Sequence, residues 1–318
     1  MADTGGLRDY LDGRFRTCDE DGVYYAHQPI YGFRGGRCEP DLFDRYMRTD
    51  QILRALSTGP FETLLDVGAA EGYKAHLAHR FRGLRVTASD LSTEACRRAV
   101  ELFSIPSVAA DARDLPFGRE AFDVVLCSET LEHLRDWEVA LRELLRVARM
   151  AVVVTVPHEP EESVRSIRDR NVRFGHVNRF QLGSLDHLRV EGHVVVARRL
   201  IARRLRLPQV LVEAVPRRHH GLTRYPPALF DAYNAVLPAL RRLWGVRTAA
   251  ALVRLDSWLC RLPVEHRALL FVVWKPGHEP AGSGQPVPAR DLVGFARPLH
   301  RIAGEVREWD WGYAPPAP

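Results

Sequence analysis

FETLLDVGAAEGYKAHLA, residues 61–78, runs from a short apolar segment into a turn that carries two glycines, Gly68 and Gly72. The residues before the turn are typical of a buried strand, and those after it have apolar side chains at helical spacing. Glycine lets the backbone turn tightly and approach a ligand closely. The spacing D-V-G-A-A-E-G lacks the middle glycine of the dinucleotide fingerprint G-x-G-x-x-G. The turn therefore predicts a ligand-binding loop of a different kind.

Strands and helices alternate on both sides of this turn. Apolar segments rich in β-branched residues are expected to be strands, and the amphipathic segments between them helices. This alternation predicts right-handed βαβ units and an α/β fold with a doubly wound, mainly parallel sheet. Seven strands are expected, at residues 63–68, 85–90, 108–112, 123–128, 150–157, 193–200 and 268–276.

The chain outside these strands has less regular patterns. About 65 residues separate the last two strands, too many for a hairpin link, and their apolar spacing predicts a helical insertion interrupted at Pro238 that covers the active site. A further helix is expected over residues 291–309. The predicted parts are an N-terminal lid or substrate segment at 1–44, a core at 45–200, the insertion at 201–267, the final core strand at 268–276, and a linker and tail at 277–318.

The composition limits the classes of protein to which the chain can belong. The 318 residues are 46% hydrophobic, enough for a large core, and the five cysteines form no C-x-x-C pair. A disulfide framework and a zinc cluster are therefore not expected, and a reducing cytoplasm is. The start of the chain has no targeting pattern and no apolar run is long enough to span a membrane, so no membrane partner is expected. The net charge of +5 comes from arginines spread along the chain, so nucleic acid is not the expected partner.

The residues that follow the first four strands resemble the motifs of class I S-adenosylmethionine-dependent methyltransferases. The motifs occur in the family's order within residues 64–134, and the resemblance implies a Rossmann-like methyltransferase sheet with S-adenosylmethionine as cofactor. It implies that Asp90 accepts both ribose hydroxyls and that Asp111 and Ala112 contact the adenine. The residues implied to bind the cofactor are Asp66, Gly68, Gly72, Asp90, Leu91, Asp111, Ala112 and Ser128.

Each of these residues also has a purely structural interpretation. The glycines suit an ordinary strand-to-helix turn, Asp90 a helix N-terminus, and Asp111 a turn. Asp66 can order the glycine turn through backbone amides without touching the cofactor. Four motifs in the right order favour cofactor binding over these separate interpretations.

Acidic and histidine side chains gather after the fourth and fifth strands. The pattern E-x-x-E-H followed by G-H-x-x-x-F resembles the metal-binding set of small-RNA 2′-O-methyltransferases and ubiquinone-pathway O-methyltransferases. That resemblance implies that a divalent ion, with Mg expected first, lowers the pKa of a substrate hydroxyl. A mixed set of carboxylates and imidazoles also suits Mn, Fe or Zn. The implied ligands are Glu129, Glu132, His133 and His176, and the candidate catalytic residues are His133, His158 and Glu129.

Two other interpretations of the same side chains stay open. In the first, the glutamates cap a helix and order the cofactor loop. In the second, five glutamates, with Glu159, Glu161 and Glu162 among them, attract a cationic acceptor to the site.

These patterns lead to a hypothesis about the reaction. We expect methylation of a small polar, sugar-containing metabolite, with N-methylation of an amino sugar in aminoglycoside-type antibiotic biosynthesis as the first hypothesis. The alternatives are metal-assisted O-methylation of a sugar or catechol hydroxyl, an RNA methyltransferase whose affinity falls steeply with salt, and a module that binds the cofactor without transfer.

Overall fold

The computed structural model describes residues 4–16, 42–170, 174–203, 227–240, 245–294, 299–302 and 305–308. The chain divides into two compact units. The first contains residues 1–28, 51–200 and 266–285, and the second contains residues 29–50, 201–265 and 286–318. The boundaries fall within α2 (Leu42–Ala55) and β6 (Val194–Ala202). The five-part division expected from the sequence stays a prediction.

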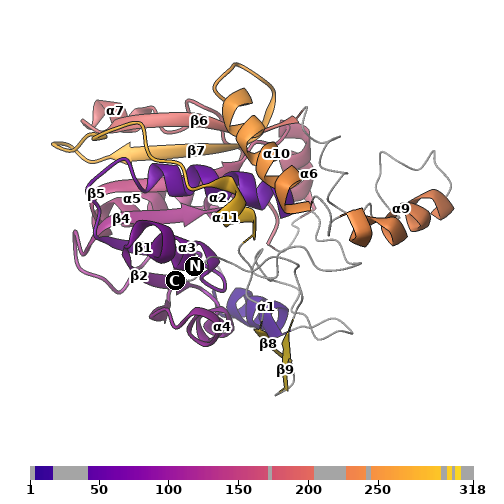
Figure 1. The fold of residues 1–318 in the computed structure, drawn as a ribbon. Helices are drawn as coiled ribbons and strands as arrows, with labels where there is room; N and C mark the ends of the chain where they lie inside the picture. The colour runs from indigo at the N-terminus through magenta and orange to yellow at the C-terminus, as the bar shows by residue number, and fades with distance from the viewer. Residues whose placement is uncertain are drawn as a thin grey trace. The chain divides into compact units, whose positions relative to one another are not determined.

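A seven-stranded sheet forms the centre of the first unit (Figure 1). Its order is β3-β2-β1-β4-β5-β7-β6. Neighbours among β1 to β5 are parallel, and β7 runs antiparallel to β5. The predicted doubly wound, mainly parallel sheet is thereby confirmed. The strands are β1 (Thr63–Val67), β2 (Arg85–Asp90), β3 (Ser107–Ala109), β4 (Phe122–Ser128), β5 (Ala148–Pro157), β6 and β7 (His266–Trp274).

Helices connect and flank these strands (Figure 1). α5 shows why its segment is helical, because Ala140, Leu141 and Leu144 recur at helical spacing and are buried in the core beside β4 and β5. The helices of this unit are α1 (Thr4–Arg16), α3 (Tyr73–Arg82), α4 (Thr93–Phe103), the 3₁₀ turn η2 (Leu131–His133), α5 (Trp137–Val147), α6 (Glu161–Asp169) and α7 (His187–Val190).

The strand order reverses at β1, which lies between β2 and β4. The register pairs Val67 with Ser89 on one side and with Cys127 on the other. The loops after these three strands therefore begin at the same edge of the sheet. This edge is where ligands bind in open α/β sheets.

The second unit contains α9 (Pro227–Leu240), α10 (Val246–Leu259) and α11 (Ala289–Gly294). α10 packs against α11, and the buried Asp256 of α10 accepts hydrogen bonds from the amides of Ile201 and Ala202. No helix among the residues described is both long enough and apolar enough to cross a membrane.

Two predictions about secondary structure outside the first unit are wrong. α9 continues through Pro238, which lies in its last turn, where the missing N–H removes a single hydrogen bond. The helix expected over residues 291–309 ends at Gly294, and β8 (Leu299–Ile302) pairs antiparallel with β9 (Glu305–Glu308).

Candidate functional site

The turn after β1 requires glycine at position 68. Gly68 has φ +70°, and a Cβ built there would lie 2.1 Å from Oγ1 of Thr130 in the loop after β4. Its amide donates a hydrogen bond to the carbonyl of Ser89 at 2.8 Å. Gly72 has φ +76° and lies against Ala99 of α4. The loops after β1 and β4 thus approach each other closely enough to exclude any side chain at position 68.

Asp90, at the end of β2, ties this turn to the next loop. Its Oδ2 accepts a hydrogen bond from the amide of Ala70 at 2.8 Å, and its Oδ1 accepts one from the amide of Ser92 at 2.9 Å. Burial raises the pKa of Asp90. Ala70 has φ +49°, a left-handed conformation that costs energy outside glycine and is stabilised here by the bond to Asp90. The carboxylate is therefore fixed in orientation with lone pairs left over on both oxygens.

Asp66, on β1, is buried and its Oδ2 has no hydrogen-bond partner among the residues described. Burial raises the pKa of Asp66 to about 7, although Lys74 and the amide of Ala75 oppose the rise. A buried carboxyl oxygen without a partner is rare and costly. This oxygen is therefore suited to a ligand or water that donates a hydrogen bond.

Asp111, after β3, is engaged by its neighbour Arg113. Its Oδ1 accepts from the Arg113 amide at 2.9 Å, and its Oδ2 lies 2.7 Å from the guanidinium. Burial alone would raise the pKa of Asp111, but the hydrogen bonds from Arg113 hold it below its usual range. This arrangement is the turn-forming alternative expected for Asp111, and the neighbouring Ala112 is buried.

Ser128 and Glu129 lie at the end of β4 beside β5. The Ser128 and Thr155 hydroxyls are 2.6 Å apart, and Thr155 also donates to Oε1 of Glu129 at 3.3 Å. Glu129 has φ +57°, and its amide donates to the Thr155 carbonyl. These contacts place both the amide and the carboxylate of Glu129 against Thr155 of β5.

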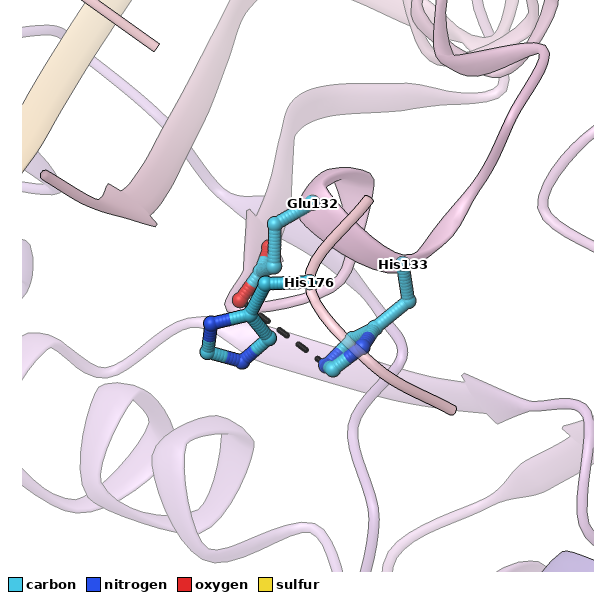
Figure 2. A group of neighbouring side chains, drawn as sticks. All are labelled: Glu132, His133 and His176. Atoms are coloured by element: carbon cyan, nitrogen blue, oxygen red, sulfur yellow. Dashed lines mark ion pairs between the residues drawn. The ribbon is translucent and has the colours of Figure 1, made fainter. Parts of the chain in front are cut away.

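Three of the four expected metal ligands come together. One ligand atom from each of Glu132, His133 and His176 lies within 4.8 Å of the others, and Glu129 is outside this group. Figure 2 shows the three side chains facing one another, and its dashed line joins Oε1 of Glu132 to Nε2 of His133, which are 4.0 Å apart. The amide of Val177 donates to the Glu132 carbonyl at 2.8 Å and so holds the His176 loop against η2.

The protonation state of His133 follows from its surroundings. Its ring stacks on Phe174 at 3.9 Å between centroids, and its Nδ1 lies 3.2 Å from the Gly175 carbonyl. Burial, followed by the nearby His176, lowers the pKa of His133 to about 4. The ring is thus neutral at pH 7. Because a carbonyl only accepts, Nδ1 carries the proton and Nε2 keeps its lone pair.

One ring nitrogen of His176 contacts the carboxylate of Glu159. Its Nδ1 lies 2.8 Å from Oε2 of Glu159. A histidine backed by a carboxylate on one nitrogen is the usual arrangement of a metal ligand. The cluster of Glu132, His133 and His176 therefore fits a divalent ion that accepts nitrogen and oxygen ligands.

The remaining expected residues have other contacts. Nδ1 of His158 donates to the Phe180 carbonyl at 3.0 Å, and the ring stacks on His266; both contacts lie outside the cluster. Glu161 lies 3.7 Å from both Arg168 and Arg179. Part of the acidic charge expected around the site is thus neutralised by arginines.

Several residues that shape the site had no sequence motif to reveal them. Phe174 and Gly175 hold His133, and Thr130 packs against the glycine turn. Helix α1 packs against α4 (Figure 1), and its Asp12 bonds to Ser92 in the loop after Asp90. A weak signal existed for Ser92 alone, since a serine before T-E-A is a typical helix N-cap.

Part of the chain is similar to known proteins. Residues 65–154 match the family described as a methyltransferase domain. A fatty-acid O-methyltransferase of Mycolicibacterium smegmatis is 37% identical over 143 residues, which are 42% of this chain and 52% of that protein. A demethylmenaquinone methyltransferase of Mycobacterium tuberculosis is 35% identical over 106 residues, 33% of this chain and 44% of that protein. The chain thus spans about half, or less, of the length of these relatives.

A solved structure is similar in fold. Phosphoethanolamine N-methyltransferase 2 of Haemonchus contortus superposes with a TM-score of 0.51 at 18% identity, over 85% of this chain and 60% of that one. Within residues 65–154 the chain is thus similar to methyltransferase domains, in agreement with the resemblance that its motifs indicated.

Proposed function

We propose that this protein transfers a methyl group from S-adenosylmethionine to a small-molecule acceptor. The observation that carries the proposal is the joined edge of β1, β2 and β4, where Gly68 admits no side chain and Asp90 is locked to the amides of Ala70 and Ser92. S-adenosylmethionine, when bound, supplies a methyl group already activated on a sulfonium. The protein then has to bind the acceptor in line with that methyl and exclude water.

We assign cofactor-binding roles to the side chains at this edge whose oxygens can still accept hydrogen bonds. Asp90 keeps acceptor capacity on both oxygens, which suits the two hydroxyls of a ribose. The unpartnered Oδ2 of Asp66 suits a hydrogen-bond donor from the ligand. Asp111 is held by Arg113, so we assign adenine contact to the turn around Ala112 rather than to the Asp111 carboxylate alone.

We further propose an oxygen acceptor. A hydroxyl or carboxyl acceptor has to lose its proton before or during attack, whereas an amine has only to be neutral. Glu132, His133 and His176 would hold a divalent ion, which supplies a Lewis acid that lowers the pKa of the acceptor oxygen. Gly175 and Glu159 orient the two rings for this role, because each occupies the Nδ1 of one histidine.

N-methylation of an amino sugar has weaker support from these contacts. Glu132 is fully buried, Glu159 lies against His176, and Glu161 lies between two arginines. These glutamates are therefore not a free acidic surface for a cationic sugar. The relatives compared above are named for a fatty acid and a demethylmenaquinone, and the first name specifies transfer to oxygen. The covering role of residues 201–267 and the cytoplasmic location stay predictions.

The test is transfer of labelled methyl from S-adenosylmethionine to fatty acids, catechols, neutral glycosides, aminoglycosides and tRNA, each with and without EDTA. We expect product on an oxygen acceptor, lost with EDTA and restored by Mg²⁺ or Mn²⁺. His176→Gln should lose this activity, while Glu162→Gln, an exposed change outside the cluster, should keep it. Product on aminoglycosides alone, indifferent to EDTA, would overturn the oxygen acceptor and the metal. Absence of S-adenosylhomocysteine binding by calorimetry would overturn the methyltransferase itself.

A further inference from the structure

Helix α1 is fastened to the loop that follows Asp90. Oδ1 of Asp12 accepts hydrogen bonds from Oγ of Ser92 at 2.5 Å and from the amide of Glu94 at 3.0 Å. Asp12 thus caps the N-terminus of α4 from a different helix. Nε of Arg8 donates to the Leu91 carbonyl at 3.1 Å, so α1 forms hydrogen bonds with both Leu91 and Ser92, the loop between β2 and α4.

Ser92 joins this fastening to the cofactor site. Its amide donates to Oδ1 of Asp90, while its hydroxyl donates to Asp12 and accepts from the amide of Ala95. The orientation of the Asp90 carboxylate and the position of α1 therefore depend on the same residue. Moving α1 away would remove the Asp12 cap and loosen the loop that aims Asp90.

Another face of α1 contacts Phe174, which stacks on His133 of the cluster. The Arg14 guanidinium lies 5.8 Å from the ring centroid of Phe174, and Phe174 stacks on His133. Asp12 and Arg14 are two positions apart, so they point to different sides of the helix. A helix of 13 residues presents both contacts as one body.

We propose that α1 couples cofactor binding to the arrangement of His133, with Asp12 and Arg14 as the positioning residues at the two contacts. This inference rests on the proposed function, because the ligand at Asp90 is taken to be S-adenosylmethionine. A ligand shifts an equilibrium only through differential contacts with its two states. A cofactor held by Asp90 favours the loop arrangement that α1 stabilises, and the docked α1 keeps Arg14 over Phe174. By reciprocity, order at His133 raises cofactor affinity.

The test needs no acceptor and no metal. Selective ¹³C labelling of histidine Cε1 allows the His133 resonance, assigned by its loss in His133→Gln, to be followed by NMR as S-adenosylhomocysteine is added to the full chain. We expect the resonance to shift on saturation in the wild type. Arg14→Gln should bind S-adenosylhomocysteine yet lose most of this shift. Asp12→Asn should weaken binding by about tenfold, within the usual range of couplings, and reduce the shift. Asp9→Asn, an exposed change on the same helix, should match the wild type.

The outcomes separate the two proposals. Binding of S-adenosylhomocysteine with no His133 shift in the wild type, or with an undiminished shift in Arg14→Gln, would overturn the coupling and leave the methyltransferase proposal intact. No binding by the wild type would overturn both. Retained binding in Arg14→Gln shows that this variant is folded, so loss of the shift there supports the coupling rather than a general loss of structure.

Discussion

Replacing Gly68 by alanine tests the closeness of the loops after β1 and β4. The φ of +70° costs a residue with a Cβ about 1–2 kcal/mol. The new Cβ would also lie 2.1 Å from Oγ1 of Thr130, and forcing that side chain off its rotamer adds about 0.5–1.5 kcal/mol. We therefore expect Gly68→Ala to lower the free energy of unfolding by about 2–3 kcal/mol, measured by urea denaturation.

Gly83 provides the matched control for this change. Its φ is +68°, nearly the same as that of Gly68, but a Cβ there would meet no atom within 4 Å. Gly83→Ala should thus carry the backbone cost alone, about 1–2 kcal/mol. The double variant Gly68→Ala with Thr130→Ala should recover part of the loss, because it removes the clashing hydroxyl. Equal losses at positions 68 and 83, with no recovery in the double variant, would refute the close approach of the two loops.

Two further changes test buried charges in the same unit. The native pKa of Asp66 is raised to about 7, so between about pH 4 and 7 the folded state holds a proton that the unfolded state has lost, and stability falls as pH rises through that window. Asp66→Asn should lessen this fall by up to about 4 kcal/mol between pH 4 and pH 8. Identical pH profiles of unfolding in the variant and the wild type would contradict the shift. Arg98→Met breaks the fully buried pair with Glu71 and should lower the free energy of unfolding by about 3–5 kcal/mol. Arg97→Gln, on the exposed side of α4, should lower it by less than about 1 kcal/mol. Similar losses in the two variants would contradict the difference in burial.

The sheet could be predicted from the sequence because its signals are local. Apolar strands, amphipathic helices and the turn at Gly68 and Gly72 each lie within a few neighbouring residues. The same holds for Asp90, which follows its own strand directly. The wrong predictions fall where local signals conflict: Pro238 is tolerated in the last turn of α9, and Leu299, Ile302 and Val306 lie in a strand pair instead of a helix.

The contacts that complete the site could not be predicted because they join residues far apart in the chain. Arg14 reaches Phe174, and Gly175 and Glu159 each occupy one nitrogen of a histidine in the cluster. Hydrogen bonds of this kind leave no spacing in the sequence. The patterns E-x-x-E-H and G-H-x-x-x-F together suggested four ligands. Glu129, however, has a positive φ and its carboxylate accepts from Thr155, which leaves three. The donor atoms that the cluster presents therefore depend on the ring orientation and burial of His133, which folding sets and spacing alone does not encode.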